Sequence, residues 1–298
     1  MKLTTLIACL FACILLAPVT LKAQDVDLLK LVGEDKPKKE IIKNAFKSTR
    51  VINSHSMEFL SAGTLDFRIL HRFGSLDQGY KNFFGFDQAS MRMGFDYGIL
   101  QNLMIGIGRS TYKKEADGYL KFAPVRQAKG AGSFPITIAL VAGMTMNTSE
   151  WADPARKNFL TSRFAYYFQT IFGRKFNDVV TLQVAPTMVH YNIVPLNTQS
   201  NDIYAVSAGG RIKFSKRMAF TFDYSYLVYG IDQNIYHNPL SVGIDIETGG
   251  HVFQLHFSNS TGMNERAFIT ETTNDWKKGE VRFGFNLSRV FQIKKNKK

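Results

Sequence analysis

The chain has 298 residues, of which 45% are hydrophobic and 13% aromatic, and 37 Lys and Arg against 24 Asp and Glu give a formal net charge of +13. This apolar and aromatic content excludes a disordered or low-complexity chain. The two cysteines, Cys9 and Cys13, lie in the first apolar stretch. Removal of that stretch leaves no thiol for a disulfide, a zinc site or catalysis.

The N-terminus has the layout of a secretory signal peptide. Lys2 precedes an apolar run over residues 6–17, and the small residue Ala23 closes the segment. We expect cleavage after residue 23, which also removes Lys22 and leaves a mature charge of 13 − 2 = +11. A lipobox at Cys9 is the weaker interpretation, because most of the apolar run follows this cysteine. The run is also shorter than the ~20 residues of a membrane-spanning helix.

A polar, lysine-rich segment over residues 24–63 follows and is expected in the periplasm. Within it, residues 47–60 allow three interpretations. They could form a periplasmic strand, a piece tucked into the lumen of a barrel, or an additional barrel strand.

From residue 64 onward, apolar and polar residues alternate in segments of about ten residues, which is the pattern of β-strands. Between Met218 and Val228, every second residue is apolar or aromatic, whereas Thr221, Asp223 and Ser225 lie on the other face. The pattern predicts twelve strands, over residues 64–73, 88–99, 103–112, 118–127, 134–147, 158–172, 179–191, 203–214, 218–229, 240–248, 251–258 and 280–291.

The links between these strands alternate between long and short, as in up-and-down transmembrane barrels. Short turns such as 101–102 and 249–250 are expected on the periplasmic side, together with both termini, and the long links 74–87 and 259–279 outside. We therefore predict an all-β fold: an up-and-down antiparallel transmembrane β-barrel of about 12 strands (10–14) over residues 64–291. A basic tail, residues 292–298, would follow.

A soluble β-sandwich is the alternative for many short strands. One face of the predicted strands carries Phe, Tyr, Leu and Met, as a lipid-facing band would, and the other mixes Gly, Ser and Thr with charges, as a wet lumen would. Together with the signal peptide, the link pattern and the aromatic last strand, this polarity favours the barrel.

Five runs of the chain are distinctive: Thr49 to Asn53, Leu65 to Gly74, Trp151 to Pro154, Asp245 to Phe257 and Gly262 to Phe268. Together they resemble an uncharacterised family of predicted outer-membrane β-barrel proteins from the Bacteroidota. The resemblance covers roughly residues 36–291 and implies fold and location, with no assigned activity to carry over. The basic tail after Phe291 departs from barrels that end on an aromatic residue.

If the apolar face meets lipid, a set of charged side chains faces the lumen. These side chains suit either a channel that orients a polar solute or a set of ion pairs that fills the barrel. The two signs nearly balance, so the sequence predicts no ion selectivity. The lumen and constriction candidates are Asp66, Arg68, Arg72, Arg92, Asp96, Arg163, Arg211, Lys213, Asp223, Asp245, Glu247, His256 and Arg282.

Two pairs of residues raise the question of catalysis or metal binding. His256 and Ser258 resemble the His-x-Ser pair of outer-membrane phospholipases, but they fall on the predicted lumen face instead of the lipid face. Asp245 and Glu247 share a face and could bind calcium. Arg211 and Arg282 could equally neutralise them, and this interpretation is favoured. The six histidines show no metal-binding or haem-attachment spacing, so we expect no metal, no cofactor and no catalytic residue.

The sequence thus predicts a non-enzymatic, porin-like or structural barrel with a charged lumen for a small polar solute, in the outer membrane of a Gram-negative bacterium. Its expected partners are outer-membrane lipid and lipopolysaccharide; the dispersed positive charge lacks any nucleic-acid recognition motif. An alternative is a scaffold barrel that binds a partner through the 259–279 loop. The third possibility is a lipid or ester hydrolase that uses His256 and Ser258.

Overall fold

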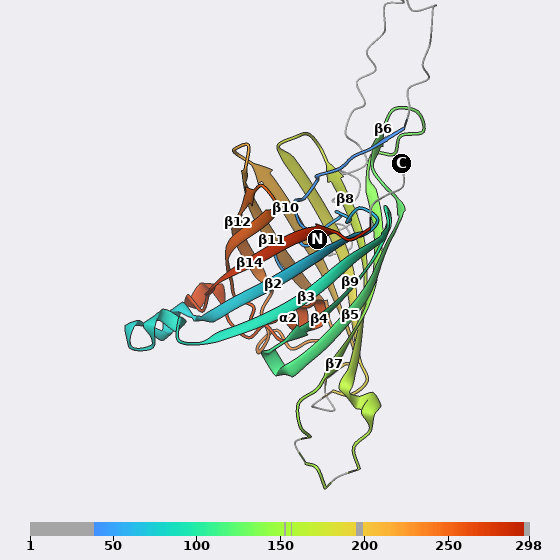
Figure 1. Cartoon of the computed structure of the whole chain (residues 1–298). Coiled ribbons are helices and arrows are strands. Elements are labelled where there is room, and N and C mark those ends of the chain that lie inside the picture. Colours follow the sequence, from blue (N-terminus) through green and yellow to red (C-terminus); the bar gives the residue numbers. More distant parts are fainter. Residues whose placement is uncertain (1–38, 152, 156, 195–198, 295–298) are drawn as a thin grey trace, which may run out of the picture. The chain divides into compact units, whose positions relative to one another are not determined.

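The computed structural model describes residues 39–151, 153–155, 157–194 and 199–294 (Figure 1). The predicted signal peptide, residues 24–38 of the predicted periplasmic segment and the end of the basic tail lie outside the described residues.

Twelve strands pair in chain order, each antiparallel to the next, and β14 pairs with β2 to close the barrel. A separate two-stranded pair joins β1 (Glu40–Ile41) to β6 (Ala128–Lys129). The predicted up-and-down β-barrel is therefore confirmed. Its strands are β2 (Thr64–Ser75), β3 (Ala89–Leu100), β4 (Leu103–Ser110), β5 (Glu115–Val125), β7 (Thr137–Asn147), β8 (Phe164–Lys175), β9 (Val180–Tyr191), β10 (Asp202–Lys213), β11 (Met218–Tyr229), β12 (Leu240–Thr248), β13 (His251–Ser258) and β14 (Arg282–Gln292).

The alternation of side chains along each strand places the apolar residues outside, as β11 shows. Phe220 and Tyr226 are 39% and 40% exposed, whereas Thr221 and Ser225, on the other face, are 0% and 1% exposed. A soluble sandwich would bury the aromatic face, so this burial pattern is that of a membrane barrel. No helix among the described residues is long and apolar enough to cross a membrane.

The short and long links separate the two open ends of the barrel. We call the end with the short links, such as residues 101–102 and 249–250, the turn mouth, and the opposite end the loop mouth. The loop mouth carries the short helices η2 (Leu76–Gln78), η3 (Tyr80–Gly85), η4 (Tyr112–Lys114), η5 (Leu160–Arg163) and η6 (Trp276–Lys278).

One predicted strand begins later than expected. The alternation suggested a strand over residues 158–172, but residues 160–163 form η5 and β8 starts at Phe164. A hydrogen bond of 3.1 Å from the Ser162 amide to the Phe159 carbonyl closes this turn before the strand begins.

The segment that precedes β2 lies inside the barrel. We call residues 43–62 the N-terminal insert. Every residue from Thr49 to Met57 is buried, and hydrogen bonds between Val51 and Ser54 and between Thr49 and Ser56 fold the segment into a narrow hairpin. Of the three interpretations of residues 47–60, the structure shows the piece tucked into the lumen.

The link between β13 and β14 also enters the lumen, from the loop mouth. We call residues 259–272 the β13–β14 insert; it contains α2 (Glu265–Thr270), which lies within the ring of strands (Figure 1). Gly262 to Thr270 are all buried. The expectation that the whole 259–279 loop faces outward is therefore wrong for its first half, because Glu265 and Arg266 find partner charges inside the barrel.

Two sequence features allow the β13–β14 insert to fold there. Asn264 caps α2, since its side chain accepts a hydrogen bond from the Ala267 amide at 2.9 Å. At Gly262 the backbone passes so close to α2 that a Cβ atom would lie 2.5 Å from the Ala267 backbone. A side chain at this position would push the helix out of its place.

Candidate functional site

The two inserts meet at a buried ion pair in the middle of the lumen. Arg50 of the N-terminal insert donates to both carboxylate oxygens of Glu265 at 2.9 and 3.4 Å, and the two side chains are 2% and 0% exposed. The His55 ring lies 3.4 Å from the same carboxylate. We call Arg50 and Glu265 the latch.

Burial and neighbouring charges fix the protonation of these groups. Burial, and next to it the positive charge of Arg50, holds the pKa of His55 well below 6.5, so that the ring is neutral at pH 7. Burial raises the pKa of Glu265, while Arg50 opposes this effect. The latch therefore consists of one cation and one carboxyl group with a neutral histidine beside them.

The tip of the N-terminal hairpin is held by a carboxylate of the barrel wall. Asp223 on β11 accepts hydrogen bonds from the backbone amides of Asn53 and Ser54, both at 2.8 Å, and from the Ser54 hydroxyl at 2.9 Å. Arg72 on β2 donates to the Asn53 side chain at 2.7 Å. A tight turn directs several amides to one point, which suits an anionic side chain.

Other wall residues bind the backbone of the N-terminal insert. Lys121 on β5 donates to the carbonyl groups of Ser56 and Glu58 at 2.6 and 2.7 Å. Gln183 on β9 accepts from the Met57 amide at 2.8 Å and donates to the His55 carbonyl at 2.7 Å. These polar side chains satisfy backbone groups that would otherwise lie unpaired in the lumen.

Ion pairs along the wall neutralise the remaining charges. Asp66 and Asp96 stand directly opposite each other on β2 and β3, an arrangement that is unfavourable for like charges. Arg68 lies 2.6 Å from Asp66 and 3.7 Å from Asp96 and compensates both. Thr49 of the N-terminal insert donates to Asp96 at 2.8 Å, so the insert takes part in this cluster.

The structure brings together most of the predicted lumen residues, but not all of them. Glu247, Lys213 and Arg282 are half-buried near the two mouths. Arg163 is wrong as a lumen residue: it lies in η5, before β8 begins, and its guanidinium stacks 3.6 Å from the Trp151 ring centroid. The residues that face the interior and are buried are Asp66, Arg68, Arg72, Arg92, Asp96, Arg211, Asp223, Asp245 and His256.

His256 and Ser258 do not form a nucleophile and base pair. Both ring nitrogens of His256 lack a hydrogen-bond partner among the described residues. The Ser258 hydroxyl instead accepts from the Ser241 hydroxyl at 2.7 Å. Both side chains are buried in the lumen, and a serine without a base in reach is a weak nucleophile.

Asp245 and Glu247 are neutralised by an arginine. Arg211 lies 3.8 Å from Asp245 and 3.1 Å from Glu247, and Glu247 also pairs with Lys47 at 2.9 Å. Within the described residues, no group of three or more His, Cys, Asp or Glu side chains is placed to hold a metal ion.

The sequence interpretation missed the residues of the two inserts and one face of β5. The inserts show no strand period, so alternation left residues 47–60 open among three interpretations and did not place the 259–279 loop in the lumen. The face of β5 was detectable, because Glu115, Asp117 and Lys121 alternate with smaller or apolar residues. Asp117 pairs with Arg92 at 2.8 Å and Glu115 pairs with Arg266 at 2.6 Å.

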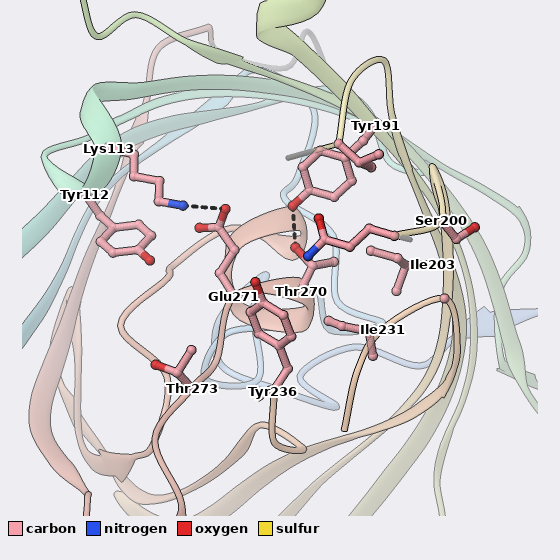
Figure 2. Close-up of a pocket in the computed structure, with 13 residues that line it drawn as sticks. Tyr112, Lys113, Tyr191, Ser200, Ile203, Ile231, Tyr236, Thr270, Glu271 and Thr273 are labelled. Carbon is pink, nitrogen blue, oxygen red and sulfur yellow. Dashed lines mark hydrogen bonds and ion pairs between the residues drawn. The ribbon is translucent and has the colours of Figure 1, made fainter. Parts of the chain in front are cut away.

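A pocket lies at each mouth, and the inserts lie between them. The pocket at the turn mouth, of about 220 Å³, is lined by residues that include Phe46, Glu58 and Arg126. The pocket at the loop mouth, of about 230 Å³, is lined by residues that include Tyr191 and Glu271 (Figure 2). The latch and the buried hairpin separate these two spaces.

The chain resembles solved outer-membrane structures only distantly. The NanC porin is 7% identical, with 76% of this chain and 98% of that chain covered and a TM-score of 0.48. The KdgM porin is 8% identical, with 76% and 99% covered and a TM-score of 0.46. The translocator domain of the autotransporter NalP from Neisseria meningitidis is 11% identical, with 79% and 90% covered and a TM-score of 0.37. With TM-scores below 0.5, these likenesses do not indicate what this chain transports or binds.

Among proteins with curated descriptions, none matches the chain in sequence. A family model described as a membrane-bound β-barrel domain (DUF5777) matches residues 46–291. This range includes the hairpin of the N-terminal insert, the β13–β14 insert and all twelve strands except the last residue of β14. The match agrees with the family resemblance of the sequence, whereas the Bacteroidota origin stays an expectation. The chain therefore belongs to the family of membrane-bound β-barrel domains.

Proposed function

We propose that the protein is a porin-like channel for a small polar solute, whose lumen is closed by the two inserts in the state described by the structure. It would act in the outer membrane of a Gram-negative bacterium, after cleavage of residues 1–23, with the turn mouth in the periplasm. Outer-membrane lipid and lipopolysaccharide would surround its apolar outer face. The observation that carries the proposal is the latch, in which Arg50 and Glu265 join the two inserts.

The chemistry of the inserts is consistent with closure that can be released. The N-terminal insert is held largely by hydrogen bonds from wall side chains such as Asp223 and Lys121 to its backbone. Water can replace such bonds when the insert moves, because they are worth only about 0.5–1.5 kcal/mol each in net terms. The charged wall that remains would then line a wet passage.

A permanently closed, structural barrel is the second candidate. It is favoured by the continuous burial of Thr49 to Met57, which leaves no gap at the latch. A scaffold role through the 259–279 loop has less surface available than the sequence suggested. Residues 262–270 are buried, so a partner would meet mainly the exposed residues Thr273 and Lys277 to Gly279.

We also propose that the protein is not an enzyme. The geometry of His256 and Ser258 supports this proposal, since neither contacts the other through a hydrogen bond among the described residues.

Liposome swelling tests the channel against the structural barrel. The mature chain and a latch variant, Glu265→Gln, would be reconstituted and exposed to small neutral and charged solutes. The channel proposal expects slow or no swelling with the wild type and rapid swelling with Glu265→Gln. Swelling that matches protein-free vesicles for both proteins and for every solute would contradict transport and favour the structural barrel. A heat-modifiable gel band controls for folding in each case.

A further inference from the structure

The pocket at the loop mouth has the size of a small-molecule site. It holds about 230 Å³ and opens beside the C-terminal end of α2 (Figure 2). Tyr112 and Lys113 of η4 lie on one side, Ile203 and Ile231 lie on the other, and Glu271 lies between them. A volume of this size suits a molecule of about one sugar ring.

One wall of the pocket is apolar and aromatic. Ile203 and Ile231 lie beside the rings of Tyr191 and Tyr236, and these residues pack against the apolar cluster below them. The face of an aromatic ring carries negative electrostatic potential, so it attracts the weakly positive C–H groups of an apolar molecular face. This wall suits a flat ligand with C–H groups on one side.

The opposite wall is polar, and its charges balance. Glu271 accepts hydrogen bonds from Lys113 at 2.7 Å and from Arg266 at 2.6 Å, and Arg266 also pairs with Glu115 at 2.6 Å. Burial raises the pKa of Glu271, but Arg266 and Lys113 outweigh it and hold that pKa below its ordinary value. Lys113 and Glu271 line the pocket and the Arg266–Glu115 pair lies next to them, so a charged ligand would find no excess of the opposite charge.

One oxygen of the same carboxylate is left without a donor. Both cations bind Oε1 of Glu271, whereas Oε2 is buried and makes no hydrogen bond of ordinary geometry among the described residues, with the Tyr112 hydroxyl facing the same carboxylate. A buried acceptor without a donor costs free energy, which a ligand hydroxyl would recover. The Thr273 hydroxyl also lines the pocket and can exchange hydrogen bonds with a ligand, whereas the Thr270 hydroxyl is already bonded to the Arg266 carbonyl and the Tyr191 hydroxyl.

We propose that this pocket binds a neutral, polyhydroxylated solute of about one sugar ring, with its C–H face on Tyr191 and Tyr236 and a hydroxyl donating to Glu271. The ligand would be the solute that the channel handles, and to that extent the inference rests on the proposed function. Binding itself does not require the lumen to open. A bound ligand would touch the residue that follows α2, the helix that carries the latch residue Glu265.

Saturation-transfer NMR on the mature chain in detergent micelles tests the ligand class. Glucose serves as the neutral probe, and glucuronate and glucosamine serve as charged probes of the same size. The proposal expects saturable binding of glucose and weaker binding of both charged sugars. No saturable binding of glucose, or tighter binding of either charged sugar, would overturn it.

Two pocket variants and a matched control locate the binding. Ile231→Trp fills the pocket and is expected to weaken glucose binding at least about tenfold, whereas Thr273→Val removes one hydroxyl and is expected to weaken it about fivefold. Ile235→Trp lies in the same loop, is 50% exposed and does not line the pocket, so it is expected to leave binding unchanged. Equal glucose affinity in the wild type and in both pocket variants would overturn the proposed site.

The two proposals can be contradicted independently of each other. If the pocket binds no glucose, liposomes with Glu265→Gln should still swell. If no protein makes the liposomes swell, glucose should still bind to the mature chain in micelles. The heat-modifiable band confirms that each variant is folded, and Thr273→Val tests the site even if Ile231→Trp does not fold.

Discussion

Breaking the latch should release the N-terminal insert without unfolding the barrel. The variant Glu265→Gln keeps the shape of the side chain but leaves Arg50, which is 2% exposed, without its carboxylate at 2.9 Å. Removal of one partner from a buried ion pair costs about 3–5 kcal/mol, because the other charge stays buried and unpaired. We take the lower end, about 3 kcal/mol, since the amide oxygen of Gln still accepts one hydrogen bond.

This cost converts directly into a change of population. At about 1.4 kcal/mol per factor of ten, 3 kcal/mol raises the fraction of molecules with a displaced insert roughly 100-fold. A single thiol placed by Val51→Cys reports the change, because Val51 is 1% exposed and the native cysteines lie only at positions 9 and 13. Maleimide labelling of the mature chain in micelles should therefore accelerate about 100-fold in Glu265→Gln when insert opening is fast.

A matched control and a double variant decide whether the latch causes the effect. Asp178→Asn removes the carboxylate of an exposed pair with Lys175, and it should leave labelling unchanged because such pairs contribute little. Arg50→Met combined with Glu265→Met should label more slowly than Glu265→Gln, since no unpaired charge remains. An unchanged labelling rate in Glu265→Gln with a folded barrel, or an equal rise in Asp178→Asn, would show that the latch does not hold the N-terminal insert in place.

Three further predictions concern the insert, pH and the membrane face. Asp223→Asn should speed amide hydrogen exchange at residues 52–54 by at least about tenfold, because the acceptor that these amides share loses its charge. Exchange as slow as in the wild type would show that Asp223 does not hold the tip of the hairpin. The pKa of His55 is held below 6.5, mainly by burial, so His55 contributes stability that is present above pH 6.5 and is lost as the pH falls. Maleimide reacts with the thiolate, so each labelling rate is divided by that of a free thiol at the same pH. The normalised labelling of Val51→Cys should then rise below about pH 6.5 more steeply in the wild type than in His55→Asn. Glu265, whose pKa is raised, contributes in the opposite direction in both proteins, and parallel pH profiles would exclude His55 as the cause. Phe220→Arg, on the outer face, should lower refolding stability in lipid by about 2–4 kcal/mol if it lies near the bilayer midplane, as measured by urea titration; a loss no larger than that of Phe220→Ala would argue against a lipid-facing position.

The strands and their faces were predictable because alternation has a local physical cause. A residue such as Thr221 differs from Phe220 in polarity, and a period of two directs them to opposite faces. The same logic failed at Arg163, because it continued the strand period into a segment where the chain forms η5. Strand ends depend on local turns, which alternation does not report.

The closed lumen was not predictable, because an open and a filled barrel both need polar inner faces. Arg50 and Glu265 are 215 residues apart, and neither lies in a segment with a strand period. The sequence did contain an indirect signal. The runs Thr49 to Asn53 and Gly262 to Phe268, which carry the family resemblance, are the two segments that meet at the latch.

Single-channel conductance shows directly whether the N-terminal insert closes the lumen. The mature chain and a variant that lacks residues 43–62 would be compared in planar bilayers, after a heat-modifiable band has shown that both are folded. We predict that the wild type is closed for most of the record and that the deletion variant conducts steadily. A steady conductance of equal size in both proteins would show that the N-terminal insert does not close the lumen. A silent record from the folded deletion variant would likewise contradict closure by this insert.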